Sequence, residues 1–199
     1  MILNSFYNKN IKLLIFSFIL ALYFKHLAYS QTSNFENKIS DPPLCSNNRG
    51  EKVYFKNLNS KTGRFTAGVA KRDINGLPII YRFNYQKSSK ALQLFIDFHE
   101  CAHHQTGDLE KKPPKQNSFE YMMKESIADC LAAIRIKSDK INGQFLIKEV
   151  LVELKKDMTI IGFSKSTIES REMNIKKCFK KNISLSTYID DILNKRSLK

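Results

Sequence analysis

The chain has 199 residues, and 42% of them are hydrophobic, which is enough for one domain with a real core. Its 33 lysine and arginine residues outnumber its 19 acidic residues and give a formal net charge of +14 at pH 7. The sequence has no internal repeat and no low-complexity tract, which excludes repeat and fibrous architectures.

The first thirty residues have the pattern of a secretory signal peptide. Lys9 and Lys12 precede an apolar run at residues 13–24, and no acidic residue is present. A run of about twelve residues suits a signal peptide and is shorter than the roughly eighteen needed to span a bilayer. Ala28 and Ser30 place small residues where signal peptidase cleaves, so we expect cleavage after residue 30. The alternative is a retained N-terminal anchor.

Export limits the partners that the basic charge can attract. Basic surfaces bind nucleic acid, acidic polymers and anionic membrane faces. In an exported protein, nucleic acid is the least expected of these, and an anionic envelope surface remains as a candidate. The lysines are spread along the sequence, so much of the charge can also be an ordinary solvated surface.

Two β-strands are predicted near the start of the domain. Residues 31–48 are polar and contain Pro42-Pro43, so we expect a flexible lead-in before a single domain at 49–199. The β-like runs 65–70 and 77–83 then flank Asn75-Gly76, a strong signal for a hairpin turn. Gly68, inside the first run, indicates a place where another chain can approach the backbone closely.

Helices are predicted for most of the remaining sequence. Apolar residues at steps of three and four predict a helix over residues 90–105, which Gly107 can cap. A second helix is predicted at 118–137, because Asn117 and Glu120 have the spacing of a capping box. Further helices are expected at 144–156, at 165–181 and in the segment that contains Tyr188, Ile189, Ile192 and Leu193. The fold class is therefore α+β, with a largely helical C-terminal half.

The stretch His99-Glu100-Cys101-Ala102-His103 matches the motif H-E-x-x-H. On a helix, residues four apart lie on one face, so both imidazoles can bind a single metal ion. Zinc suits two imidazoles and a carboxylate, with a fourth position left for water. Glu100 can then act as the general base that activates this water.

The third metal ligand is expected on the next helix. Metzincins place a third histidine six positions after the second one, but here that position holds Leu109. Glu125 follows His103 by 22 residues and is the candidate ligand. Asp129 lies one turn after Glu125, where its carboxylate can accept a hydrogen bond from a ligand histidine and fix its tautomer.

The segments HECAHH and ESIADC together resemble the gluzincin pattern, H-E-x-x-H followed by E-x-x-x-D, of the thermolysin-like clan of zinc metallopeptidases. The E-x-x-A-D-C variant is closest to small bacterial neutral zinc metallopeptidases. The resemblance covers about residues 98–132 and implies a zincin-like domain with an edge strand before the active-site helix. In this clan such a strand pairs with an extended peptide substrate, and residues 67–70 are the candidate.

One feature of the clan is missing from this sequence. Thermolysin-like enzymes carry a further histidine downstream that stabilises the oxyanion, but no histidine follows His104 here. Tyr121, Tyr188 and Arg171 can each donate to developing negative charge, and the sequence does not choose among them. His104 lies about 100° around the helix from His103, so we expect a surface residue or a residue supporting the site rather than a ligand.

Four cysteines in an exported chain predict two disulfides. They are Cys45, Cys101, Cys130 and Cys178. We expect the pairs Cys101–Cys130, between the two helices that the metal brings together, and Cys45–Cys178, near the ends of the domain. An alternative leaves Cys45 free to cap the metal in a latent enzyme.

These features predict an exported zinc peptidase that acts on a peptide or protein substrate. His99, His103 and Glu125 would hold Zn²⁺, and Glu100 would activate the water. The alternative is a non-enzymatic, zinc-stabilised binding protein of the cell envelope with the same ligands. The sequence indicates neither the substrate, nor endo- or exo-cleavage, nor the oligomeric state.

Overall fold

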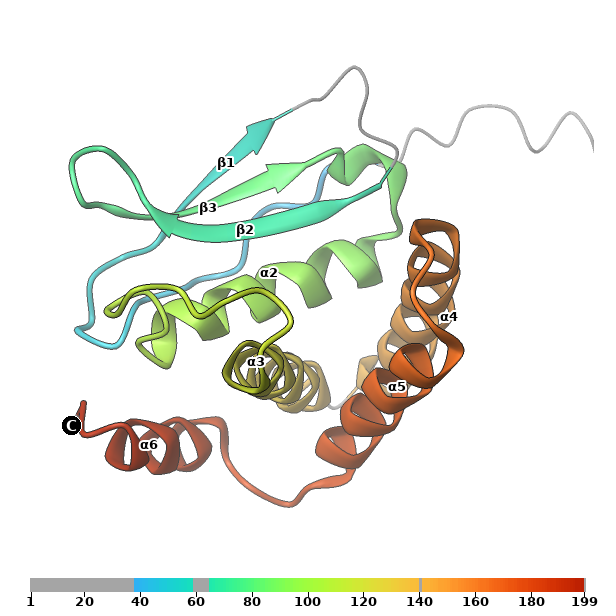
Figure 1. The fold of residues 1–199 in the computed structure, drawn as a ribbon. Coiled ribbons are helices and arrows are strands. Elements are labelled where there is room, and N and C mark those ends of the chain that lie inside the picture. The colour runs from blue at the N-terminus through green and yellow to red at the C-terminus, as the bar shows by residue number, and fades with distance from the viewer. Residues whose placement is uncertain (1–37, 59–64, 140, 199) are drawn as a thin grey trace, which may run out of the picture. The chain divides into compact units, whose positions relative to one another are not determined.

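A computed structural model of the chain describes residues 38–58, 65–139 and 141–198. The expected signal peptide, its cleavage point and the first part of the lead-in lie outside these residues. Within them, a small three-stranded sheet is followed by five α-helices, which confirms the α+β prediction (Figure 1). The strands are β1 (Tyr54–Leu58), β2 (Ala67–Arg72) and β3 (Pro78–Phe83), and a 3-10 turn, η1 (Tyr85–Lys87), follows them. The helices are α2 (Lys90–Gln105), α3 (Phe119–Lys137), α4 (Gly143–Ile161), α5 (Lys165–Lys180) and α6 (Leu185–Lys195).

The predicted hairpin is formed by β2 and β3, which pair antiparallel. Asp73 Oδ1 accepts hydrogen bonds from the N–H groups of Asn75 and Leu77, at 2.8 Å each, and Gly76 adopts a φ of 79° that favours glycine. β1 was not predicted, and it pairs parallel to β3 on the other side. Its five residues are half-buried or exposed, so no clear alternation marks it in the sequence. Among the described residues, the strand order β1-β3-β2 leaves one edge of β2 without a neighbouring strand, here called its free edge.

Helix α2 lies between the sheet and the remaining helices (Figure 1). Ser89 caps its first turn by accepting a hydrogen bond from the N–H of Leu92, and Gly107 follows its end with a φ of 69°. Ala91 and Phe95 belong to the main core, which α2 shares with α3, α4 and α5. The prediction of this helix from its apolar spacing is therefore confirmed.

A buried ion pair fastens the sheet to α2. Arg82 on β3 donates through Nε to Asp97 Oδ1 at 2.9 Å, and a second contact joins its Nη2 to the other carboxylate oxygen. Tyr85 donates its hydroxyl to the same carboxylate at 3.0 Å. Arg82 and Asp97 are almost fully buried, so removing either partner would leave an uncompensated charge in the core.

The helix boundaries differ from the prediction at two places. Ser118, not Asn117, caps α3, because Asn117 has a φ of 62° and so cannot serve as the residue that leads directly into the helix. Helix α4 extends to Ile161, beyond the predicted end at residue 156, and ends at Gly162 with a φ of 96°. No helix among the described residues is both long and apolar enough to cross a lipid bilayer.

The four cysteines form two disulfides, but the predicted pairing is wrong. The observed pairs are Cys45–Cys101 and Cys130–Cys178, with Cα–Cα distances of 5.9 Å and 5.1 Å. Cys101 faces the sheet side of α2, where it packs with Cys45 and Val53, whereas Cys130 lies in a different buried cluster. Cys130 faces α5 instead. The alternative in which Cys45 caps the metal is also contradicted, because its sulfur is bonded to Cys101.

Peptide mapping without reduction should recover one linked pair that contains Cys45 and Cys101 and another that contains Cys130 and Cys178. The loop closed by Cys130–Cys178 spans 48 residues, so the variant Cys130→Ser/Cys178→Ser should lose about 2–4 kcal/mol of unfolding free energy in urea titrations. A linked pair containing Cys101 and Cys130 would contradict the structure.

Candidate metal centre

Three ligand-type side chains meet beneath the free edge of β2. His99 and His103 lie one turn apart on α2, and Glu125 faces them from α3. The Nε2 atoms of the histidines are 3.2 Å apart, and His99 Nε2 is 3.3 Å from Glu125 Oε2. Two nitrogens bound to one tetrahedral zinc ion would be about 3.3 Å apart. His99, His103 and Glu125, here called the ligand cluster, could therefore hold a metal ion.

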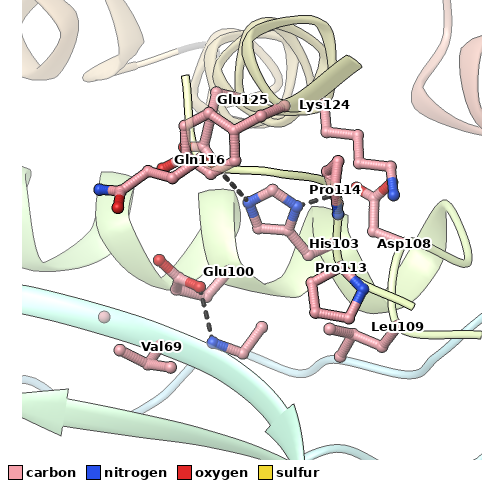
Figure 2. Close-up of a pocket in the computed structure, with 13 residues that line it drawn as sticks. Val69, Glu100, His103, Asp108, Leu109, Pro113, Pro114, Gln116, Lys124 and Glu125 are labelled. Carbon is pink, nitrogen blue, oxygen red and sulfur yellow. Dashed lines mark hydrogen bonds and ion pairs between the residues drawn. The ribbon is translucent and has the colours of Figure 1, made fainter. Parts of the chain in front are cut away.

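Each ligand histidine is oriented by a carboxylate on its other nitrogen. His99 Nδ1 lies 2.9 Å from Asp129 Oδ1. His103 Nδ1 lies 2.8 Å from Asp108 Oδ2, as Figure 2 shows. The carboxylates accept, so both Nδ1 atoms carry hydrogen. The two Nε2 atoms, which face Glu125, are then the atoms available to a metal.

Each of these carboxylates is in turn bound by an arginine. Arg171 on α5 donates to Asp129 through Nε and Nη2, both at 2.8 Å. Arg196, which follows α6, donates from Nη1 to Asp108 Oδ1 at 2.6 Å. Burial alone would raise the pKa of Asp129, but Arg171 and His99 outweigh it and hold that pKa far below its usual range. The pKa of Asp108 is likewise lowered against the effect of burial, by His103, Arg196 and Thr106.

Asp108 and Arg196 also belong to the site, although no sequence motif indicated them. Asp108 lies five residues after His103, where the chain turns back after Gly107, and its N–H donates to the carbonyl of His103 at 3.0 Å. The positive φ of Gly107 directs this return and was the local signal available. Arg196 is 88 residues from Asp108, so no local pattern could join them.

Glu100 lies beside the ligand cluster but is not part of it. Its Oε2 accepts a hydrogen bond of 2.7 Å from the N–H of Ala70 on β2 (Figure 2). Gly68 makes this approach possible, since a Cβ there would lie 2.4 Å from Glu100 Cγ and 2.7 Å from Ile96 Cγ2. The close approach expected at Gly68 therefore comes from α2. A carboxylate in this position can act as an acid or a base toward a molecule held at the cluster.

Two cavities meet at this point along β2. One, of about 470 Å³, lies toward the end of β2 at Ala70 and is bounded by His103, Leu109, Pro113 and Tyr121, among others (Figure 2). The other, of about 200 Å³, lies toward Thr66 and is lined mainly by apolar side chains. Both cavities share Gly68, Glu100 and Glu125, so space extends from the cluster in both directions along the strand.

The remaining candidate residues lie in different places. Tyr121 lines the larger cavity and Arg171 the smaller one. Tyr188 lines neither and packs among the helices, where Lys181 Nζ lies 4.7 Å from its ring centre. His104 is buried, not on the surface, and its Nε2 lies 3.2 Å from the carbonyl oxygen of Ile79. Burial lowers the pKa of His104 to about 4, so at neutral pH it is uncharged and donates to β3.

The variants His103→Ala and His104→Gln separate the ligand cluster from its neighbour. His103→Ala should lower the affinity for a divalent metal by at least about a hundredfold, because one of three ligands is lost. His104→Gln keeps a donor for Ile79 and should bind metal as the wild type does. Competition with a chromophoric chelator measures both, and equal affinities in the two variants would contradict the assignment of His103.

Metal binding should also release protons near neutral pH. Burial disfavours the charged form of His99, but its hydrogen bonds with Asp129 and Glu125 outweigh burial and raise its pKa to about 10. Metal-free His99 is therefore protonated at pH 7.5, and Nε2 must lose its proton to bind an ion. Titration calorimetry in two buffers with different ionisation heats should show at least one proton released per metal. Affinity should consequently fall as the pH is lowered, and buffer-independent heats would refute this reading.

Comparisons with known proteins assign the chain to no family. No protein-family model, curated protein or solved structure matches it.

Proposed function

We propose that this chain is an exported zinc-dependent peptidase of the gluzincin type. The observation that carries the proposal is the position of Glu100. Its carboxylate is held beside the ligand cluster by Ala70, yet it is not one of the residues of that cluster. A site that only stabilised the fold would have no need for this carboxylate.

Zinc is the proposed metal because of the donor set. Two imidazoles and one carboxylate are typical of catalytic zinc, whereas structural zinc sites usually have four protein ligands. The described residues supply three at this position. Bound there, zinc would lower the pKa of a water to about 7 and polarise a peptide carbonyl.

Glu100 supplies the acid–base chemistry of the proposed reaction. As a carboxylate it takes a proton from the attacking water, and it then passes that proton to the nitrogen of the breaking peptide bond. The hydrogen bond from Ala70 fixes one oxygen of Glu100, so the other is left for the proton transfer. Tyr121 is the proposed donor to the developing oxyanion, since it lies in the larger cavity with Glu125, while Arg171 is already bound to Asp129 through two nitrogens.

The free edge of β2 is the proposed binding site for the substrate backbone. Ala70 donates to Glu100 and not to β3, so its polar groups and those of Gly68 point away from the sheet. Because the N–H of Ala70 is held by Glu100, an extended peptide would pair with the carbonyl oxygen of Ala70 and with the backbone groups of Gly68. Cavities on both sides of the ligand cluster accommodate residues before and after the cleaved bond, which favours cleavage within a chain over removal of a terminal residue.

An exported location agrees with the cysteine chemistry. Both disulfides are typical of proteins that fold in oxidising compartments. The sequence stays strongly basic without Lys9, Lys12 and Lys25 of the expected signal peptide, which would favour contact with an anionic envelope surface. A non-enzymatic zinc-binding protein would share the ligands and the location, so activity of a Glu100 variant is the test that separates the two functions.

Glu100→Gln removes the basic carboxylate and keeps the size of the side chain. Hydrolysis of an unfolded protein or a peptide library should fall by about two orders of magnitude or more, because proton transfer is lost. Zinc content, measured by elemental analysis, should remain one ion per chain. The control Glu169→Gln changes a carboxylate that is 57% exposed on α5 and should leave activity unchanged.

Two outcomes of this experiment would contradict the proposed peptidase activity. Wild-type protein with full zinc and no activity against any such substrate would support the binding protein. Full activity in Glu100→Gln would place the chemistry elsewhere in the molecule.

A further inference from the structure

Arg196 connects the segment after α6 to the end of α2. Its Nη1 donates to the carbonyl oxygen of Thr106 and to Asp108 Oδ1, both at 2.6 Å. Thr106 is the residue at which α2 ends, so the guanidinium also satisfies a carbonyl at the C-terminus of that helix. The Arg196 side chain is 19% exposed, which shields these contacts from water.

Asp108 depends on Arg196 for its charge balance. Its side chain is 4% exposed, and its Oδ2 is occupied by His103 Nδ1 and by the hydroxyl of Thr106. Lys124 is 3.9 Å from Oδ1, which is beyond hydrogen-bond range. Among the described residues, Arg196 is thus the permanent cation that hydrogen-bonds to this carboxylate.

The position of Arg196 is fixed by the packing of α6. Ile192 is buried against Ala102 of α2 and Leu131 of α3. Beyond Arg196, Leu198 packs on Gly107, where a Cβ would lie 2.4 Å from Leu198 Cδ1. Apolar contacts before and after Arg196 therefore aim its side chain at Asp108.

We propose that Arg196 is a positioning residue of the metal centre, which couples the docking of α6 to metal binding through Asp108 and His103. The inference rests on the proposed function only in taking His103 as a metal ligand. With Arg196 in place, the Asp108 side chain is held in one orientation and fixes the His103 ring with Nε2 toward Glu125. Without Arg196, a buried Asp108 would turn toward water or Lys124, and the ring would lose its fixed orientation.

Coupling of this kind acts in both directions. If docked α6 raises metal affinity by some factor, bound metal raises the stability of docked α6 by the same factor. A residue that only stabilised the fold would change stability with and without metal equally. The proposal therefore predicts that bound metal stabilises docked α6, and that this stabilisation is lost when Arg196 is replaced.

The test compares Arg196→Met with Lys195→Met in the full chain, using zinc and cobalt as probes. Arg196→Met keeps an unbranched stem and removes the donors, and Lys195→Met removes the same charge from an exposed neighbour. Arg196→Met should bind zinc about tenfold more weakly by chelator competition, in the range seen when groups behind a metal ligand are changed. It should also alter the visible spectrum of the cobalt-loaded protein. Lys195→Met should match the wild type, and Arg196→Lys should recover part of the affinity.

Hydrogen exchange tests the reverse direction. Zinc should slow amide exchange in residues 185–195 of the wild type and of Lys195→Met, but not of Arg196→Met. If Arg196→Met fails to fold, Leu198→Ala loosens α6 without removing the arginine and should weaken zinc binding in the same direction.

Unchanged zinc affinity in Arg196→Met, or equal exchange in α6 with and without zinc, would overturn the coupling. These readouts do not need turnover. A wild type that binds zinc, shows the coupling and cleaves nothing would defeat the proposed peptidase and leave this inference standing.

Discussion

The structure depends on two series of hydrogen-bonded ionisable side chains that lead from the ligand cluster into the helical half of the molecule. In each, a histidine donates to an aspartate, and the aspartate accepts from an arginine. The two series are His99–Asp129–Arg171 and His103–Asp108–Arg196. Buried carboxylates are unfavourable unless they are paired, so each aspartate needs its arginine as much as each histidine needs its aspartate. Arg171 lies on α5 and Arg196 directly follows α6, so the C-terminal half has a direct part in the site.

The sheet contributes to the same site from the opposite side. β2 brings a free backbone edge and one N–H group to Glu100, and Gly68 leaves the room that this contact needs. The ion pair between Arg82 and Asp97 holds the sheet against α2, so the edge keeps its distance from the ligand cluster. Helix α2 is thus fixed on both faces, by the sheet on one and by α3 and α6 on the other.

Local sequence pattern predicted what depends on neighbours in the chain. Apolar spacing gave helix α2, the Asn75-Gly76 turn gave the hairpin, and the spacing of His99 and His103 required only one helical turn. The predictions that were wrong depend on which faces of the helices and of the sheet pack against one another. The cysteine pairing was wrong because the side of α2 on which Cys101 lies faces the sheet, and its sequence position does not reveal this.

The parts of the site that the sequence did not reveal are also long-range. Asp108 stands in a loop, where no periodicity assigns it a direction. Arg196 reaches it across 88 residues through the packing of α6. β1 was not predicted because its residues are half-buried or exposed, and their strand geometry comes from pairing with β3. Tertiary contacts, not propensity, decide such positions.

Each disulfide contains one cysteine that is adjacent in sequence to a residue of the site. Cys101 directly follows Glu100, and Cys130 directly follows Asp129. One bond fastens α2 to the segment before β1, and the other fastens α3 to α5, so each of the two helices that carry the ligands is anchored covalently. If a metal ion binds at the ligand cluster, oxidation would favour metal loading, because both stabilise the same folded state. A newly made chain kept reduced would hold its ligands loosely, and the ligand cluster would reach its final geometry where the thiols are oxidised.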